Sequence, residues 1–272
     1  MLIAQISDLH IGMGTKSVLN DERLEQVIER VQAAVPDLVL VTGDLIEGQD
    51  AAAYDRLKVL MAPLTGPVLY TIGNHDQREA FRAAFTDTPT HGGLVQYARE
   101  FDDRRIIVLD TVEAGQHGGA FCESRAAWLS QTLDERPDTP TMIALHHPPV
   151  ASGIAWMDVG ANGPWSERLE AVLVGRRQVV AMVAGHIHRP FVTSFAGHSL
   201  IVAPSSAPQV VLDLGSGTGD AGQTRLPRIV EEDPGFVLHL WNGRSLVSHF
   251  GSAKPHRIVA SLDIRTGRFV AG

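Results

Sequence analysis

In the first 190 residues, short apolar runs alternate with segments in which apolar residues recur at helical spacing. This alternation predicts strands joined by helices, and therefore an α/β fold. A polar cluster follows most of the apolar runs directly. Because the carboxyl ends of neighbouring strands meet at one edge of a sheet, these clusters should converge on one crevice. The runs that precede the clusters are Leu2–Ile6, Leu38–Thr42, 68–72, 143–145 and Val179–Ala184.

The polar clusters consist of side chains that bind divalent metals. Taken singly, each has a simple structural explanation: Asp8-Leu9-His10 suits a helix cap and a surface histidine, and Gly43-Asp44 suits a turn. The alternate histidines of Gly185-His186-Ile187-His188 can reach one ion. Together the clusters supply two carboxylates, one amide oxygen and four imidazoles, enough for the paired metals that hydrolyse phosphate esters. The candidate ligands are Asp8, His10, Asp44, Asn74, His146, His186 and His188.

Capping residues predict where the helices begin. Asn20 or Asp21 is expected to cap a helix that ends before Pro36, and Ser124 to cap a helix that ends near Leu133. Asp76 is expected to cap the helix after it rather than to orient His75. Further helices are expected at Ala51–Met61, 79–85 and 166–174, and further strands at 106–109 and 141–145.

After residue 190, short extended runs with turns between them replace the alternation. Four runs (Phe191–Phe195, 200–202, 237–241 and 246–250) predict a second, mostly antiparallel sheet that closes over the first, with a hairpin at Asn242-Gly243. No change of composition separates the two parts, so residues 1–272 are predicted to form one domain, with 204–272 as a less distinct C-terminal cap or second-sheet segment. The glycine-rich stretch 215–222 does not join a strand to a helix, and it is predicted to be a loop.

The composition excludes several classes of partner. The 272 residues are 44% hydrophobic, which is enough for a sizeable core, and carry a formal charge of −8. Such a chain lacks a basic surface for extended nucleic acid, so a small phosphate ester is the expected partner. Cys122 is the single cysteine, and the first residues lack the features of a signal peptide. No apolar run is long enough to cross a membrane, so a cytoplasmic protein is expected.

In their order, the clusters resemble the pattern of the calcineurin-like metallophosphoesterase superfamily: Asp-x-His, Gly-Asp, Gly-Asn-His-Asp, His and Gly-His-x-His. The resemblance spans roughly residues 1–190 and implies a four-layer α/β/β/α sandwich of two mixed sheets flanked by helices. His75 resembles the family's catalytic histidine, which contacts the phosphate with Asn74 and protonates the leaving alkoxide. His147 is expected to be structural. The implied metal sites are Asp8, His10, Asp44 and His188 for one ion and Asp44, Asn74, His146 and His186 for the other, with Asp44 bridging.

The resemblance also implies a mechanism in which a metal-bound hydroxide attacks phosphorus. Two divalent ions carry about +4, two carboxylates remove about 2, and a bridging hydroxide leaves roughly +1, which suits a diester monoanion. The second site has only the bridging carboxylate, so it should bind its ion more weakly. Its ligands suit Mn, Fe, Zn or Co, and the sequence does not distinguish among these metals.

Two differences from other branches narrow the family. Leu45-Ile46 replaces the Arg-Gly of protein Ser/Thr phosphatases, and Glu47 occupies the position of the metal-binding tyrosine of purple acid phosphatases. The strings Ser7-Asp8-Leu9-His10, Leu109-Asp110-Thr111 and His146-His147-Pro148-Pro149 resemble the bacterial class III cyclic-nucleotide phosphodiesterase and glycerophosphodiesterase branch. Members of that branch hydrolyse small phosphodiesters and self-associate, so a homo-oligomer is expected.

The substrate stays open. Small diesters such as glycerophosphodiesters are favoured, and 3′,5′-cyclic nucleotides are the alternative, which a base-stacking aromatic residue near the metals would favour. A non-catalytic scaffold of the same fold is disfavoured, because every ligand and His75 are present. Residues 151–165, with Trp156, Met157, Asn162 and Trp165, are expected to form one wall, and 204–208 with 215–222 a lid. His117, in a glycine-rich loop, is the further histidine expected to contact substrate.

Overall fold

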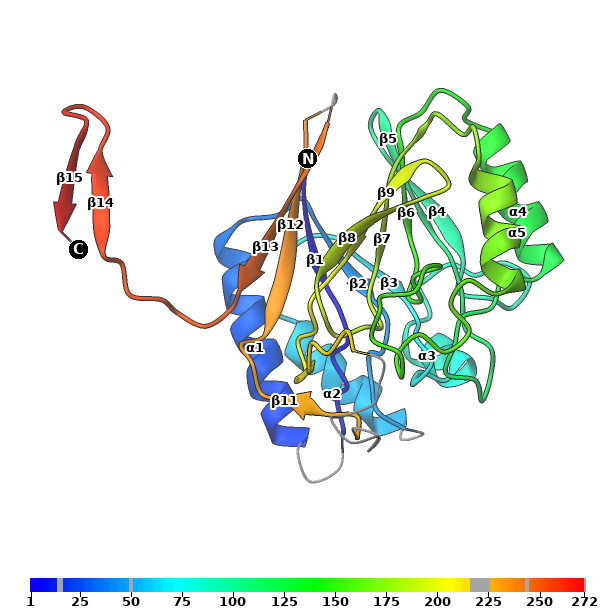
Figure 1. The fold of residues 1–272 in the computed structure, drawn as a ribbon, viewed down its shortest axis with the longest axis horizontal. Helices are drawn as coiled ribbons and strands as arrows, with labels where there is room; N and C mark the ends of the chain where they lie inside the picture. The colour runs from blue at the N-terminus through cyan, green and yellow to red at the C-terminus, as the bar shows by residue number, and fades with distance from the viewer. Residues whose placement is uncertain (14–16, 49–50, 216–225, 243–244, 272) are drawn as a thin grey trace.

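Two mixed sheets pack face to face, and helices cover the outer face of each sheet (Figure 1). The computed structural model describes residues 1–13, 17–48, 51–215, 226–242 and 245–271. This arrangement confirms the predicted four-layer α/β/β/α sandwich. None of the described helices is both long enough and apolar enough to cross a membrane.

The first sheet has the strand order β13-β12-β1-β2-β3. Its parallel part comprises β1 (Leu2–Ile6), β2 (Leu38–Thr42) and β3 (Val68–Thr71), which α1 (Ser17–Ala33) and α2 (Ala51–Met61) connect. Two strands from the C-terminal part of the chain, β12 (Gly235–Trp241) and β13 (Leu246–Ser252), extend the sheet in antiparallel pairing beside β1. The first strand of the chain therefore lies inside the sheet, buried on both sides.

The second sheet has the order β4-β5-β6-β7-β9-β8. Its strands are β4 (Tyr97–Phe101), β5 (Arg104–Val108), β6 (Thr141–Ala144), β7 (Val179–Ala184), β8 (Phe191–Phe195) and β9 (His198–Val202). Helices α4 (Glu123–Asp134) and α5 (Pro164–Leu173) cover its outer face, whereas α3 (Arg78–Ala84) packs through Phe81 against Tyr54 of α2 and Tyr70 of β3.

The prediction that the four late runs form a sheet of their own is wrong. The strands β8 and β9 join the second sheet, whereas β12 and β13 join the first. Pairing with β12 covers the open edge of β1, and it lets buried His239 share a hydrogen bond of 3.0 Å with Gln5. Of the predicted Asn242-Gly243 turn, Gly243 lies outside the described residues, although the flanking strands do pair.

Alternate residues of the central strands explain the four layers. In β5, Ile106 and Val108 face the core shared with the first sheet, whereas Ile107 faces the core beneath α4 and α5. Successive side chains of a strand point to opposite faces, so one strand serves both cores. Both faces of the second sheet are therefore buried near its centre.

Three predicted helix caps are wrong. Helix α1 begins at Ser17, so Asn20 and Asp21 lie inside it, where Asn20 donates to the His10 carbonyl and Asp21 pairs with Arg56. The N-caps of α4 and α3 are Cys122 and Gln77, not Ser124 and Asp76. In α1, tertiary partners outweigh the local preference of these polar residues for a cap.

Two small β-ribbons lie outside the main sheets, and the sequence did not predict them. One pairs β10 (Gln209–Val210) with β11 (Ile229–Val230). The other is the C-terminal hairpin of β14 (Ala260–Asp263) and β15 (Arg268–Ala271), which projects from the body (red in Figure 1). The predicted loop 215–222 lies outside the described residues except for Gly215.

Candidate metal centre

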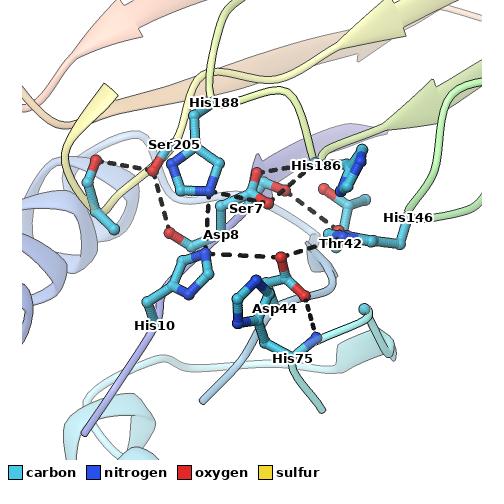
Figure 2. Close-up of polar contacts among 12 residues, drawn as sticks. Ser7, Asp8, His10, Thr42, Asp44, His75, His146, His186, His188 and Ser205 are labelled. Carbon is cyan, nitrogen blue, oxygen red and sulfur yellow. Dashed lines mark hydrogen bonds and ion pairs between the residues drawn. The ribbon is translucent and has the colours of Figure 1, made fainter. Parts of the chain in front are cut away.

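The loops that follow β1, β2, β6 and β7 bring the predicted metal ligands together at one end of the two sheets (Figure 2). Potential ligand atoms of Asp8, His10, Asp44 and His188 all lie within 4.8 Å of one another. A second group, His146, His147 and His186, meets the same limit. The two groups adjoin, because His146 Nε2 lies 3.3 Å from Asp44 Oδ2.

The backbone at this site adopts conformations that side chains rarely accept. Nine non-glycine residues of the described chain have positive φ, and five of them are predicted ligands. Such strained backbone persists where the surrounding structure holds it, and it clusters at functional sites. The five are Asp8 (52°), His10 (47°), Asp44 (47°), His186 (72°) and His188 (54°).

Glycines give the ligands the space they need. A Cβ at Gly73 would collide with the Asp44 carboxylate and would lie 2.7 Å from His146 Nε2. A Cβ at Gly185 would collide with the Ser7 hydroxyl. The glycines of the Gly-Asn-His-Asp and Gly-His-x-His clusters are thus required by close packing against the ligands.

Three of the histidines are each fixed by a hydrogen bond that the Nδ1 atom donates. The Nδ1 atom of His146 donates to the Thr42 carbonyl (2.7 Å), that of His188 to the Pro208 carbonyl (2.9 Å), and that of His10 to Glu47 Oε2 (2.6 Å). An imidazole that donates through Nδ1 presents the lone pair of Nε2. The Nε2 atoms of His10 and His188 lie 3.0 Å apart, so one cation could accept both lone pairs.

The two carboxylates are anchored across the site. Asp8 accepts hydrogen bonds from the His186 amide at 2.9 and 3.2 Å, and Asp44 accepts one from the His75 amide at 3.0 Å. Burial alone would raise the pKa of Asp44, but the neighbouring histidines, His146 foremost, outweigh it and hold that pKa well below its usual value. Asp44 is therefore ionised and available to a cation.

Burial lowers the pKa of His188, and that of His186 well below its ordinary value, which keeps both rings neutral. Neutral imidazoles and ionised carboxylates are the ligand forms that divalent transition metals take. The donor set, its orientation and its close packing therefore fit metal ions.

Asn74 connects the second group of histidines to His117. Its Oδ1 lies 3.2 Å from His147 Nε2, and its Nδ2 lies 3.3 Å from His117 Nδ1. The other ring nitrogen of His147 lies 2.8 Å from the Thr111 hydroxyl. With both nitrogens engaged, His147 holds Asn74 in place. The ring of His117, the histidine singled out in the glycine-rich loop, lies 4.8 Å from that of His186, and its contact with substrate stays a prediction.

Glu47 is a functional residue that sequence reasoning missed. Its Oε2 lies 2.6 Å from His10 Nδ1 and 2.9 Å from His75 Nδ1, so one oxygen links a predicted ligand to the predicted catalytic histidine. Burial would lower the pKa of His75, but the hydrogen bond that His75 donates to Glu47 and the negative charges of Asp44 and Glu47 outweigh it and raise the pKa to about 9. The position of Glu47, three residues after Asp44, could have indicated a place at the site. That position served only to distinguish this chain from purple acid phosphatases, which have a metal-binding tyrosine there.

Asp76 holds two ligand loops together. Its carboxylate accepts hydrogen bonds from the amides of Gly73 (2.8 Å), Leu45 (3.1 Å) and Ile46 (3.3 Å), and from the Tyr54 hydroxyl (3.0 Å). These bonds tie the loop that carries Asn74 and His75 to the loop that carries Asp44. Asp76 therefore joins these loops and does not cap the helix as the sequence had predicted.

A cavity of about 380 Å³ opens beside the ligands. Trp156 and Met157 line it, as expected for residues 151–165, and so does Pro208 from the expected lid. Trp165 does not: its indole donates to the Gly160 carbonyl, and the ring is buried in the core beneath α5. Asn162 does not line it either. Lysine and arginine are absent from its described lining, which includes the carboxylates of Asp44, Glu47 and Glu231.

A second, polar cleft of about 580 Å³ shares His75 and Glu47 with the cavity, since both residues line both spaces. Its further lining includes Asn74, Gln77 and Glu79. The predicted catalytic histidine thus borders both an apolar cavity and a polar cleft.

These features define a hydrolase-type metal centre at the strand ends of an α/β/β/α sandwich, and comparison with known proteins agrees. The family profile of calcineurin-like phosphoesterases matches residues 1–190. A probable cyclic nucleotide phosphodiesterase of Rhodopseudomonas palustris is 35% identical over 203 residues, which cover 71% of this chain and 72% of that protein. A probable glycerophosphodiester phosphodiesterase of Arcobacter nitrofigilis is 31% identical over 249 residues, 89% of each chain.

The fold is also found among solved structures. A dimetal phosphatase from Danio rerio superimposes with a TM-score of 0.64 at 16% identity, covering 93% of this chain and 99% of that one. The chain belongs to the calcineurin-like phosphoesterase family, whose members use a dinuclear divalent metal centre. This confirms the predicted superfamily, its bacterial phosphodiesterase branch and a metal-dependent phosphodiester hydrolase.

Proposed function

We propose that the chain hydrolyses small phosphodiesters with two divalent ions, one held by Asp8, His10, Asp44 and His188 and the other by Asp44, Asn74, His146 and His186. The convergence of these side chains and the orientation of the histidine Nε2 atoms support the assignment. Mn, Fe, Zn and Co all suit the donors. Bound ions would activate water and neutralise charge on the phosphate. We also propose that residues 1–272 act as one domain, because β12 completes the sheet of β1.

His75 supplies the proton in this proposal. Its Nδ1 is held by Glu47, and its ring lines the cavity, so Nε2 is the atom placed to donate to the leaving oxygen. Glu47 stabilises the protonated ring before the reaction. Asn74 and His117 would contact the phosphate or its substituents, because both side chains adjoin the centre.

The observation that carries the preference for a diester is the charge of the cavity. A monoester dianion needs more positive charge than a diester monoanion, and the described lining offers neither lysine nor arginine. Two separate spaces beside His75 suit a substrate with two separate alcohols. We therefore favour an acyclic diester that places a polyol, such as glycerol, in the polar cleft and its other alcohol in the apolar cavity.

Trp156 favours a second candidate, a 3′,5′-cyclic nucleotide. Its ring lines the cavity while it packs against the core beneath α5, so one face is available to stack on a base. The name of the Rhodopseudomonas relative also supports this candidate. A cyclic nucleotide carries both ester oxygens on one ribose and would leave the polar cleft unused.

A substrate panel on metal-loaded protein tests the proposal: glycerophosphoethanolamine, glycerophosphocholine, cyclic AMP, and a nitrophenyl diester and monoester. We expect each diester to be hydrolysed faster than the monoester, with a glycerophosphodiester giving the highest kcat/KM. Trp156→Ala should raise KM for cyclic AMP more than for glycerophosphoethanolamine. Faster turnover of the monoester would contradict a diesterase.

The single cysteine is consistent with a cytoplasmic location, which we also propose.

A further inference from the structure

Residues 205–208, between β9 and β10, contact two of the proposed metal ligands, and we call them the bracing segment. The amide of Ala207 donates to the Asp8 carbonyl (3.0 Å), and the Pro208 carbonyl accepts the Nδ1 proton of His188 (2.9 Å). Asp8 and His188 lie side by side at the centre (Figure 2), and both have positive φ. Because such backbone conformations persist only where other contacts hold them, the position of this segment matters for both ligands.

The bracing segment is itself held by Arg23 of α1. The Nε atom of Arg23 donates to the Ser206 carbonyl (2.8 Å), and its Nη2 atom donates to the Ala207 carbonyl (3.0 Å). A guanidinium is a rigid fork, so two bonds to successive carbonyls fix both peptide groups relative to the helix. Arg23 is 3% exposed, which makes this a buried contact rather than a surface one.

The charge of Arg23 is costly to bury at this position. Burial lowers the pKa of its guanidinium, and the negative charges of Glu231 and Asp233 offset that shift only in part. A smaller neutral donor would avoid most of this cost, but it could bind only one of the two carbonyls. The pair of carbonyl bonds is therefore what an arginine contributes here.

The bond from Arg23 to Ala207 affects the His188 ring through Pro208. The Ala207 carbonyl belongs to the peptide group that joins Ala207 to Pro208, and the proline ring fixes φ of Pro208. The next residue, Gln209, is held by pairing in the β10–β11 ribbon. The Pro208 carbonyl is thus fixed from both sides. It keeps the proton of His188 on Nδ1, so the lone pair of Nε2 is available to an ion.

Asn20 acts on a second ligand loop from the same face of α1. It lies three residues before Arg23, so the two side chains are neighbours on the helix. Its Nδ2 donates to the His10 carbonyl (2.9 Å), it is 1% exposed, and His10 also has positive φ. One face of α1 therefore supports the loops of three proposed ligands, Asp8, His10 and His188.

We propose that Arg23 is a positioning residue for one of the two metal sites. We call it the first metal site, and its proposed ligands are Asp8, His10, Asp44 and His188. By fixing the bracing segment, Arg23 sets the Pro208 carbonyl, which orients the His188 imidazole. The inference rests on the proposed role of His188 as a ligand. The effect should be confined to the first metal site, because the hydrogen bonds of Arg23 end on the bracing segment.

Two lysine substitutions at buried arginines test this role. Arg23→Lys keeps the charge but lacks the fork that binds two carbonyls. Its matched control is Arg105→Lys: Arg105 is 5% exposed and donates to the Thr132 carbonyl, but it lies near the start of β5, whereas the ligands follow strand ends.

Calorimetric titration of each apoprotein with Mn²⁺ measures the two sites separately. We assign the tighter step to the first metal site. Arg23→Lys should lower the affinity of the tighter step by about 10-fold or more and that of the weaker step by less than about threefold. Arg105→Lys should change both affinities by less than about twofold, because it touches neither ligand loop.

Proton NMR of the apoprotein gives a measurement that needs no metal. The Nδ1 proton of His188, bonded to the Pro208 carbonyl, should give a downfield signal that His188→Ala removes. Arg23→Lys should shift or broaden this signal, and Arg105→Lys should leave it unchanged. Pro208→Gly frees the same carbonyl while Arg23 stays in place, so it should also weaken the tighter step, and it provides the test if Arg23→Lys does not fold.

The outcomes separate this inference from the proposed function. The expected result is loss of affinity at the tighter step in Arg23→Lys, Pro208→Gly and His188→Ala, but not in Arg105→Lys. If His188→Ala weakens the tighter step but Arg23→Lys weakens both steps equally or neither, Arg23 has only a structural role and this inference alone is overturned. A tighter step that His188→Ala leaves unchanged would overturn the ligand assignment and the inference with it.

Discussion

The two groups of the metal centre differ in charge and in the contacts that their imidazoles already make. Asp8, His10, Asp44 and His188 include two carboxylates, and each of the four residues offers one ligand atom within 4.8 Å of those of the others. The group of His146, His147 and His186 contains only imidazoles, and both nitrogens of His147 are engaged by Thr111 and Asn74. The first group is therefore built to hold an ion by itself, whereas the second depends on Asp44 for negative charge.

This difference in charge predicts which of the two sites loses its ion first. A divalent cation gains most from ionised ligands, because Coulomb attraction in a buried site is weakly screened. The four-residue group offers two such ligands, and the second site shares one of them. We therefore expect unequal affinities, with the weaker ion bound at His146 and His186.

Asp44→Asn should have the largest effect, because it removes the carboxylate that we propose the two sites share. Loss of several kcal/mol of charge stabilisation corresponds to about 10³-fold or more in kcat/KM. Metal analysis of the purified variant should show that the less tightly bound ion is lost and that the more tightly bound ion is held with reduced affinity. If the variant retains both ions at wild-type affinity, Asp44 does not bridge.

His75→Ala should reduce kcat by about 10²-fold or more while both ions stay bound, since the proposed role of His75 is proton donation. Activity of the wild type should fall as pH rises through about 9, the pKa of His75, because the donor is the protonated ring. Rate profiles and metal content of both proteins check this. Loss of metal from the variant would instead make His75 a ligand.

Glu47→Gln should lower the affinity for the ion that we assign to His10 by about 10-fold to 100-fold, because Glu47 orients that imidazole. It should also move the alkaline limb of the pH–rate profile to lower pH, since the carboxylate raises the pKa of His75. The weaker ion should be less affected. Unchanged metal affinity together with an unchanged pH profile would show that Glu47 has no part in positioning.

Thr111→Val should have the smallest effect, and it should be confined to the second group. The change keeps the shape of the side chain but leaves His147 Nδ1 buried without its partner, which costs about 1–3 kcal/mol in the free energy of unfolding. Affinity for the weaker ion should fall and that for the stronger ion should not. Chemical denaturation and metal titration measure the two effects, and an equal loss at both sites would contradict the separation.

Much of this centre was predictable because its ligands follow strands. Asp8, His10, Asp44, His186 and His188 lie in short motifs after apolar runs, and topology alone brings strand ends together. Glu47 was not recognised, because its role comes from two contacts that join separate loops. The cap predictions failed for a related reason: Asn20, Asp21 and Asp76 bind partners in other elements of the chain, which local preference does not reveal.

The C-terminal part was predicted less well. Strand propensity located β8, β9, β12 and β13, but it carries no information about which edge each strand joins. β12 lies beside β1 because that edge was open and His239 could reach Gln5. The β10–β11 ribbon and the C-terminal hairpin of β14 and β15 were not predicted because their strands are short, and the apolar residues of the hairpin face solvent rather than a core.

Metal titration of the apoprotein by calorimetry tests the unequal pair most directly. We expect two ions per chain that bind with clearly different affinities, and we expect the tighter step to survive His146→Ala but not Asp8→Asn. A single ion per chain, two steps of equal affinity, or full activity after exhaustive chelation would contradict a dinuclear centre arranged around Asp44.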